Sequence, residues 1–471
     1  MDKTAECATS WRGAAGVLAL ATLVPLAPAD GAVVISSQPT EHMNCSGGLC
    51  APTAKNAIVN TSDLEAMLAS GDIEIATTGS GVEAHDILVR AAFGWPGDSR
   101  LTLDAHNAIA IRAPVSVAGA GALSLLTRGK SGALSFIAGG KLTFANPSSL
   151  LSIDGAAYTL ETSVATLAAA IAANPDGNYA LAGSYDAKGD GTYAKAPIAA
   201  AFTGAFEGLG NAILNLSVDD EANAGDDVGL FAFIDTGGSA RDVGLVGTNV
   251  TGDSTTTLGA LAGANSGTIT GSYATGMAAA GQPNAIGGLV GANEGIIENS
   301  WVTISVAGVH DAGGLAGVSS GSISRSWASG AVNQGTFAGG LVGSHGIGGA
   351  ITDSYATGTV TNGTFGGGLV GYNQGADVFS SYSTGAAVGG SSEGGFAGFD
   401  DHTLKFKSCY WDTSTSGTDK ATGNKSNDPG ISGLTTRQWK SGLPPGLSPK
   451  IWAEDRKING GLPYIRAVPP Q

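Results

Sequence analysis

The sequence predicts an all-β fold: a right-handed parallel β-helix, or solenoid, with short capping helices and an irregular C-terminal segment. The first observation is a repeat, in which turns of the form Gly-Gly-Leu-Val-Gly return every 26 to 28 residues. Repeats of this length are typical of solenoids, in which each unit buries its apolar face by stacking on its neighbours. The apolar residues of these turns, which we expect to form a column in the core, are Leu261, Leu289, Leu315, Leu341, Leu369 and Phe396.

Composition and segment length are the second and third observations. Glycine supplies 75 of 471 residues, about 16% against a usual figure of about 7%, without the period of collagen. Between the glycines lie short segments rich in Val, Ile, Thr, Ser and aromatic residues, which indicates strands rather than helices. Because each coil advances by about one strand spacing, roughly 4.8 Å, the repeats predict a rod.

The N-terminal segment 1–32 is predicted to be a signal peptide. Lys3 and Arg12 precede an apolar run over residues 14–27, and small residues suited to cleavage follow. The run is shorter than the about 20 residues that a membrane-spanning helix needs. We therefore expect an exported protein, secreted or at the cell surface, with no transmembrane segment in the mature chain.

Residues 33–84 are expected to form an N-terminal cap with one short helix. Ser62 lies three residues before Glu65, which is the spacing of a capping box, and Gly71 would end the helix. A helix over the first coil would protect an unpaired strand edge from pairing with another chain.

The cysteines fit an exported protein. Cys45 and Cys50 are close enough in sequence for a small disulfide loop, which an oxidising compartment would preserve. A metal site there would lack a second pair of ligands, so we expect no metal ion and no cofactor. Cys409 lies alone, at a position that is serine in other repeats.

The rest of the chain divides by its patterns. Residues 85–256 are expected to form β-helix coils, interrupted by a helix that ends before Pro175. Residues 257–412 contain the six clear repeats, and residues 413–471 are expected to close the other end with about one turn of helix.

An aromatic residue follows each glycine turn at a fixed distance. Side chains alternate across a strand, and Val302, Ile304 and Val306 share the face that must point inward. Trp301 therefore points outward, and its equivalents form a candidate binding face for a glycan or a partner protein. The alternative is that the rings only stack on one another or under a loop. The column consists of Tyr273, Trp301, Trp327, Tyr355, Tyr382 and Tyr410.

The Gly-Gly-Leu-Val-Gly turns and the Ser-Tyr-Ala-Thr-Gly strands resemble the GLUG motif of large bacterial surface proteins. These include filamentous-haemagglutinin-type adhesins and the non-catalytic regions of immunoglobulin A-directed metallopeptidases. The resemblance extends over roughly residues 85–465. It implies an adhesin-like protein that binds a host or environmental glycan or an extracellular protein, with an outer-membrane secretion partner as a further candidate.

Catalytic patterns were sought and none could be assigned. The stretch Gly-Val-Ser-Ser-Gly around Ser319 has the form of a hydrolase nucleophile elbow, but other repeats have ordinary turns at this place. The zinc motif His-Glu-x-x-His is missing from the sequence.

We therefore expect no enzyme, although two alternatives remain open. A polysaccharide lyase or hydrolase would need two carboxylates in register, and the residues two positions before the aromatics form no acidic column. A spacer rod without its own ligand is the other alternative. The residues two positions before the aromatics are Gly271, Asn299, Arg325, Asp353, Ser380 and Ser408.

The charge excludes one class of partner. A net charge of -16 and a pI of about 4.6 disfavour nucleic acid, because phosphate binding needs a concentrated basic surface. The acidic segment 219–227 could attract calcium or could be a solvated loop, and the sequence leaves this open.

Overall fold

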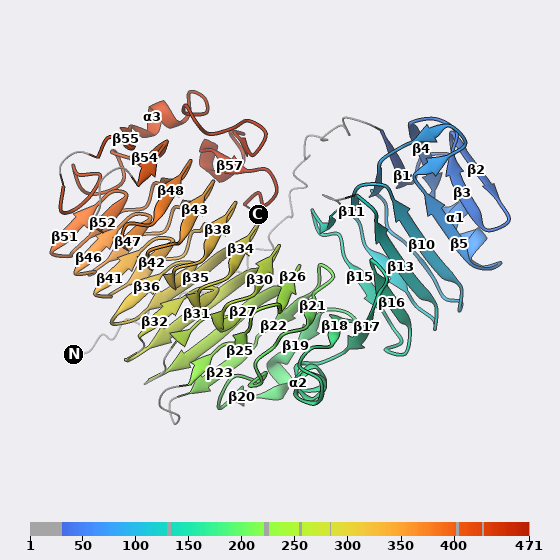
Figure 1. Ribbon diagram of the computed structural model, residues 1–471, viewed down its shortest axis with the longest axis horizontal. Helices are drawn as coiled ribbons and strands as arrows, with labels where there is room; N and C mark the ends of the chain where they lie inside the picture. Colours follow the sequence, from blue (N-terminus) through green and yellow to red (C-terminus); the bar gives the residue numbers. More distant parts are fainter. Residues whose placement is uncertain are drawn as a thin grey trace, which may run out of the picture.

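The computed structural model describes residues 31–129, 133–220, 226–253, 257–282, 284–401, 405–425 and 428–470. Over these residues the chain winds into a parallel β-solenoid of about 13 turns with few helices (Figure 1), so the predicted fold class is confirmed. The predicted signal peptide falls almost entirely outside the described residues. None of the helices in the described ranges combines the length and apolar composition needed to cross a membrane.

One sheet of sixteen strands, here called the long sheet, extends along the whole solenoid. Its neighbouring strands are parallel except at two places, β2 with β3 and β16 with β17. Its strands are β2 (Met43–Ser46), β3 (Leu49–Pro52), β5 (Ile73–Ala76), β10 (Arg100–Ala105), β13 (Ala122–Thr127), β16 (Leu150–Ile153), β17 (Ala156–Glu161), β18 (Asn178–Leu181), β21 (Ala205–Glu207), β26 (Ser239–Arg241), β30 (Thr268–Thr270), β34 (Ile296–Glu298), β38 (Ser322–Ser324), β43 (Ala350–Thr352), β48 (Asp377–Phe379) and β53 (Phe406–Lys407).

In the repeats, each coil contributes strands to the long sheet and to three further sheets. One of these three, here called the column sheet, contains β19 (Tyr185–Asp186), β22 (Ala212–Leu214), β27 (Gly244–Gly252), β31 (Tyr273–Ala280), β35 (Trp301–Ala307), β39 (Trp327–Ala328), β44 (Tyr355–Ala356), β49 (Tyr382–Ser383), β54 (Cys409–Asp412) and β55 (Ile431–Leu434). Beside this path lie β20 (Thr192–Tyr193), β23 (Ser217–Asp220), β40 (Val332–Asn333), β45 (Val360–Thr361) and β50 (Ala387–Val388).

The other two sheets have seven strands each and meet at the Gly-Gly-Leu turns. The sheet before the turns contains β24 (Asp227–Val228), β28 (Thr257–Leu258), β32 (Ala285–Gly287), β36 (Asp311–Gly313), β41 (Phe337–Gly339), β46 (Phe365–Gly367) and β51 (Ser392–Gly394). The sheet after them contains β25 (Phe231–Ile234), β29 (Ala262–Asn265), β33 (Val290–Asn293), β37 (Ala316–Ser319), β42 (Val342–His345), β47 (Val370–Asn373) and β52 (Ala397–Asp400).

The glycines of the repeat turns are required because two backbone segments meet there without room for side chains. In the turn that contains Leu341, a Cβ atom on Gly339 would lie 1.9 Å from the carbonyl oxygen of Val342. A Cβ atom on Gly340 would lie 2.1 Å from the carbonyl oxygen of Gly368 in the next coil. Both obstacles are backbone atoms, which cannot move aside without breaking the hydrogen-bond ladder. The repeated glycines therefore set the tight corner of each coil.

The N-terminal part forms its own first coils. Its five-stranded sheet contains β4 (Asn56–Asn60), β1 (Ala32–Ser36), β8 (Asp86–Val89), β11 (Ile109–Ile111) and β14 (Leu134–Phe136). A three-stranded sheet contains β9 (Phe93–Trp95), β12 (Val115–Val117) and β15 (Leu142–Phe144). Residues 33–84 therefore supply solenoid strands as well as a cap.

Helix α1 (Thr61–Leu68) covers the edge of β9, where Glu65 Oε1 accepts a hydrogen bond of 2.9 Å from the Gly94 N–H. The predicted capping residue was wrong: Asn60, rather than Ser62, caps this helix, and its side chain accepts from the N–H groups of Ser62 and Asp63. The Glu65 side chain therefore accepts a hydrogen bond from the edge of β9 and does not take part in a capping box.

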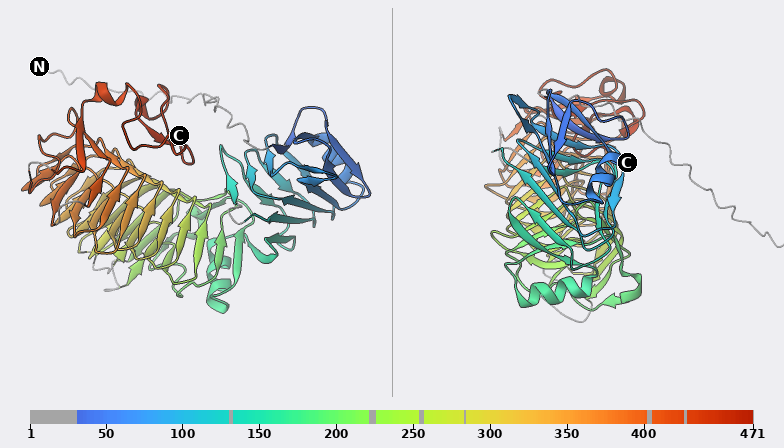
Figure 2. Two further views of the ribbon diagram at one scale, coloured as in Figure 1. Left: turned by 45° about the horizontal axis from the view of Figure 1, so that its top comes forward. Right: turned by 90° about the vertical axis from the view of Figure 1, so that its right-hand side faces the viewer.

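Two hydrophobic cores divide the solenoid. The first extends from Val33 to Leu209, and the second from Val164 to Ile431. They overlap in sequence between Val164 and Leu209, just after the antiparallel pair of β16 and β17 and inside the segment 85–256. Figure 2 shows the rod bending between its blue-green and green-red parts. Helix α2 (Val164–Ala173), capped by Ser163, follows β17 at this junction.

Candidate functional site

The apolar residues of the glycine turns form a continuous column inside the second core. Leu261, Leu289, Leu315, Leu341, Leu369 and Phe396 are all fully buried. Each backbone N–H in this column donates to the carbonyl oxygen of the next member, as between Leu315 and Leu341 at 2.8 Å. The column is therefore structural and offers no surface to a ligand.

The residues two positions before the aromatics form the opposite corner of each coil. All six have a positive φ, between 47° at Arg325 and 62° at Gly271. At the next position a serine ladder follows, in which each backbone N–H donates to the next hydroxyl oxygen, as from Ser300 to Ser326 at 3.2 Å. This geometry explains why these positions form no acidic column. The first position must adopt a positive φ and the next must supply a hydroxyl for the ladder, and neither requirement favours a pair of catalytic carboxylates.

Cys409 continues this ladder in place of a serine. Its Sγ lies 3.2 Å from the Val378 carbonyl oxygen, and the residue is fully buried. Burial raises the pKa of the Cys409 thiol to about 12. The thiol therefore stays protonated at neutral pH and packs as a small side chain.

Cys45 and Cys50 are joined by a disulfide bond between the paired strands β2 and β3, at the N-terminal end of the long sheet.

Ser319 and His345 belong to another buried ladder. The Ser319 hydroxyl accepts a hydrogen bond of 3.1 Å from Asn293, and His345 Nδ1 lies 3.0 Å from the Ser319 carbonyl oxygen. Ser319 is 1% exposed and His345 is fully buried. No substrate can reach this serine, so the nucleophile-elbow pattern is an ordinary turn.

The predicted aromatic column exists as a stack of rings outside the coil core. From Tyr273 to Tyr382 successive ring centroids lie 4.6 to 5.8 Å apart, and the ring planes differ by at most 14°. Val302, Ile304 and Val306 fill the core on the opposite face of β35. The rings therefore point away from the core, as the alternation in the sequence predicts.

The C-terminal segment, however, lies over this column. We call residues 435–468 the C-terminal cover; it contains α3 (Thr436–Trp439) and the hairpin of β56 (Trp452–Ala453) and β57 (Tyr464–Ile465). Figure 1 shows it in red, folded back over the repeats. The Trp439 and Trp452 rings both pack against Tyr382, at centroid distances of 4.8 and 5.6 Å.

Side-chain hydrogen bonds fasten the cover to the column. Trp327 Nε1 donates to the Val468 carbonyl oxygen at 2.8 Å, and the Tyr382 hydroxyl donates to the Pro463 carbonyl oxygen at 2.6 Å. Trp452 Nε1 donates to Asp353 Oδ1 at 2.9 Å.

The candidate binding face must therefore be corrected. Trp301 is 9% exposed and Tyr382 is fully buried, because the cover and the neighbouring rings exclude solvent. Tyr273, at the end of the column, is half-buried. The sequence allowed two interpretations of the column. The one that fits the covered column is that the rings stack on one another and pack under a loop.

Asp353→Ala is expected to loosen the cover by about 1–2 kcal/mol, because it removes the acceptor of the Trp452 indole N–H inside a buried contact. Hydrogen exchange followed by mass spectrometry would report this as faster exchange in residues 435–468 than in β44 and β49. Asp353→Asn is one control, since it retains an acceptor oxygen and asparagine tolerates the positive φ of 49°. Because alanine is strained at this φ, Trp452→Phe is the second comparison: it removes the indole N–H donor without changing residue 353 and should also speed exchange in the cover. Equal exchange in Asp353→Ala and Asp353→Asn would contradict the assignment.

A second aromatic cluster, which the sequence analysis missed, lies on another face. We call Phe337, Phe365, Tyr372 and Phe399 the ring surface; all four are half-buried. Their centroids are 4.7 Å apart for Phe337 and Tyr372, and between 5.3 and 5.6 Å for the other contacts. Phe337 and Phe365 are partners in β41 and β46, and Tyr372 and Phe399 are partners in β47 and β52.

Polar groups border the ring surface. The Tyr372 hydroxyl donates to Asp401, which raises the pKa of this tyrosine to about 12. Asp311 is the register partner of Phe337 one coil earlier, and burial raises the pKa of its carboxyl to about 6. Aromatic rings next to hydrogen-bonding groups are the composition of a site that holds a partly apolar, partly polar ligand.

The strongest pair of interacting carboxylates lies elsewhere, at the junction of the two cores. Burial raises the pKa of Glu207 to about 7, while the nearby Arg241 opposes the shift. Burial and the Glu207 charge together hold the pKa of Asp242 well above its usual range. Glu207 is only 4% exposed, so this pair cannot flank a polysaccharide chain as catalysis would require.

Metal chemistry finds no support in the described residues, among which no group of three or more His, Cys, Asp or Glu side chains is arranged to hold an ion. The acidic segment 219–227 is partly outside these residues, since 221–225 are not described. Asp219 and Asp227 at its ends accept hydrogen bonds of 2.8 Å from Thr251 and Thr257.

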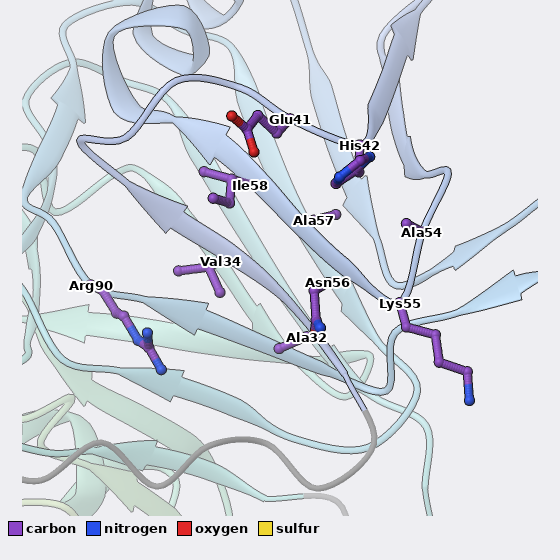
Figure 3. A pocket seen from close by; sticks show the side chains of 10 residues that line it. All are labelled: Ala32, Val34, Glu41, His42, Ala54, Lys55, Asn56, Ala57, Ile58 and Arg90. Carbon is purple, nitrogen blue, oxygen red and sulfur yellow. The ribbon is translucent and has the colours of Figure 1, made fainter.

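A shallow hollow of about 580 Å³ lies on the outer face of β1 and β4. Figure 3 shows Glu41, Lys55 and Arg90 at separate places around its rim, with small and aliphatic side chains between them. The charged groups do not converge on one point, so the hollow provides no catalytic arrangement.

Comparison with known proteins supports the repeat. The GLUG motif family matches residues 336–361, which include Phe337 of the ring surface. No curated protein sequence matches the chain.

Two solved structures are similar at 18% identity. A "putative immunoglobulin A1 protease" from Bacteroides ovatus covers 66% of this chain and 93% of its own, with a TM-score of 0.41. A structure described as IgA1 protease has a TM-score of 0.39. The alignment covers 59% of this chain and 24% of that protein. These values are too low to transfer an activity, and the resemblance to filamentous haemagglutinins stays a prediction.

Proposed function

We propose that this protein is an exported, adhesin-type binding protein, secreted or at the cell surface, that holds an extracellular glycan on the outer face of its solenoid. The ring surface is the observation that carries the proposal. It joins four rings through contacts of 4.7 to 5.6 Å between ring centroids, at partly exposed positions of the GLUG-type coils. Aromatic faces provide large, rigid contact area at low conformational cost, which suits the apolar faces of sugar rings.

Export is supported by the disulfide of the N-terminal cap. The Cys45–Cys50 bond closes a loop of a kind that persists in oxidising compartments and is rare in the cytosol. The acidic composition of the chain is compatible with such a location and disfavours nucleic acid.

Binding is favoured over cleavage by the position of the acids. Glu207 is buried and its partner Asp242 is partly buried, at the junction of the two cores, while Asp311 is the register neighbour of Phe337. Glycosidic cleavage needs two carboxyl groups on either side of the scissile bond. A spacer rod, the other alternative, would have no use for a partly exposed aromatic cluster, which costs solubility.

The test is a glycan array probed with the mature chain from about residue 33 and with a Phe337→Ala, Tyr372→Ala double variant. We expect the double variant to lose at least tenfold in affinity for each glycan that the wild type binds. Phe379→Ala is the matched control, because Phe379 is half-buried on the long sheet, away from the ring surface; its affinity should stay within twofold of wild type.

Other results would replace the proposal. Shortened products, found by mass spectrometry of a bound polysaccharide, would identify an enzyme. Binding only to extracellular proteins would identify a protein adhesin, and no binding of either kind would identify a spacer rod.

A further inference from the structure

The size of the ring surface limits what it can hold. An aromatic side chain has about 150–250 Å² of surface to bury, and each of these four is no more than about a third exposed. The rings therefore offer at most roughly 200–330 Å², whereas a stable protein interface buries about 800 Å² on each partner. This area fits a few sugar units and is too small for a folded protein.

The strand register gives the surface a direction. Asp311, Phe337, Phe365 and Ser392 occupy partner positions in four successive coils. Ser344, Tyr372 and Phe399 form a second row beside them in β42, β47 and β52. Both rows extend along the solenoid axis, with neighbours about 4.8 Å apart. A ligand that contacts all four rings lies along this axis and reaches Asp311 at one end.

Negative charge surrounds the rings. Asp311 lies at the end of one row, Asp401 accepts from Tyr372, and Glu393 follows Ser392 in β51. Lys425, the cation near this edge, is already paired with the buried Asp400 at 2.7 Å. Among the residues that the structure describes at this edge, the charges we identify are therefore mainly negative, and an anionic sugar would meet like charge.

We propose that the ring surface takes an uncharged glycan of a few sugar units, aligned along the solenoid axis, and that Asp311 is the residue that discriminates against anionic sugars. This inference rests on the proposed function. The carboxylate of Asp311 accepts hydrogen bonds from sugar hydroxyls at the end of the ring surface and repels uronic acid groups at the same place. Its raised pKa, near 6, leaves it largely ionised at neutral pH.

The experiment compares neutral hexose oligosaccharides of two to eight units with uronic acid oligosaccharides of the same linkage, at pH 7.5 and low salt. We expect at least tenfold tighter binding of the neutral series, with affinity that rises with length and levels off after a few units. Asp311→Asn should bind uronic acid sugars at least threefold more tightly and neutral sugars more weakly, because the amide is a poorer acceptor for sugar hydroxyls, so the ratio of neutral to uronic acid affinity should fall at least threefold.

Glu294→Gln is the matched control, because it removes the same charge from an exposed position on another turn of the repeats; it should leave the discrimination unchanged. If the wild type binds neutral sugars but Asp311→Asn discriminates as strongly as wild type, the role of Asp311 is overturned while the proposed function stands. Preferential binding of uronic acid sugars would overturn the ligand class, and binding of neither series would overturn both proposals.

Discussion

Gly339→Ala is expected to lower the free energy of unfolding by about 3 kcal/mol or more. The new Cβ atom would lie 1.9 Å from the Val342 carbonyl oxygen and 2.6 Å from the Gly371 backbone nitrogen. Overpacking typically costs 1–3 kcal/mol where neighbouring side chains can shift, but here both neighbours are backbone atoms of paired strands. The cost therefore lies at or beyond the upper end of this range.

Denaturant unfolding followed by circular dichroism would measure the effect. Gly183→Ala is the matched control, because an added Cβ atom there meets no atom within 4 Å; its midpoint should change little. If Gly339→Ala unfolds at the same denaturant concentration as Gly183→Ala, the corner has more room than the structure gives it. If Gly339→Ala does not fold at all, Gly363→Ala offers a graded case, because its nearest atom is the side-chain Cβ of Ala338 at 2.7 Å rather than a backbone atom at 1.9 Å.

The solenoid could be predicted from the sequence because its repeat is local. Every coil repeats the same turn, so the spacing of Leu289, Leu315 and Leu341 directly gives the stacking. The alternation in residues 301–307 gave the correct inner face for the same reason, since it depends only on strand geometry.

The cover over the aromatic column could not be predicted in this way. The Trp452–Asp353 hydrogen bond joins residues 99 positions apart, and the segment 435–468 has no repeat to reveal its place. Contacts between a repeating and a non-repeating segment are long-range, and periodicity contains no information about them. The antiparallel pairing of β16 with β17 is different, because it is a local hairpin closed by Asp154 and Gly155, both with positive φ. The Asp-Gly pair is a hairpin signal in the sequence, and the sequence analysis missed it.

The sequence contains a weak signal for the ring surface. Phe337 and Phe365 are 28 residues apart, and Tyr372 and Phe399 are 27 apart, which is the period of the repeat. Each row of the ring surface has aromatics in only two adjacent coils, three coils in all, and the coil before Phe337 has Asp311 in the first row. A column of two members is hard to separate from chance, whereas the structure shows both pairs in contact.

The Glu207 carboxyl, at the junction of the two cores, is expected to lower the free energy of unfolding by about 3 kcal/mol as the pH rises. Glu207→Gln is expected to abolish this loss. Leu160, Ala180 and Glu207 are partners in neighbouring strands, and the first two belong to the first core. Glu207 is therefore the member of this row at which the first core ends. Its Oε2 atom is buried without a hydrogen-bond partner, so the ionised carboxylate is poorly solvated there.

The sign follows from the raised pKa. In the unfolded chain the carboxyl has its ordinary pKa of about 4.5, and burial raises the pKa of Glu207 to about 7 in the folded protein. Between these values the folded state holds a proton that the unfolded state has released, so stability falls as the pH rises through this window. A difference of about 2.5 pKa units corresponds to roughly 3 kcal/mol.

Unfolding free energies at pH 4.5 and pH 8 would test this. Wild type should lose about 3 kcal/mol from this group between the two values, and Glu207→Gln should not, because the amide stays neutral. Glu294→Gln, which removes an exposed carboxyl, should keep the wild-type loss. Burial, and to a lesser extent the Glu207 charge, raises the pKa of Asp242, so Asp242 adds a pH-dependent loss of its own in both proteins, and the test is the difference between wild type and Glu207→Gln. An identical loss in wild type and Glu207→Gln would mean that Glu207 is hydrated in solution, and the junction between the cores would then be open to water.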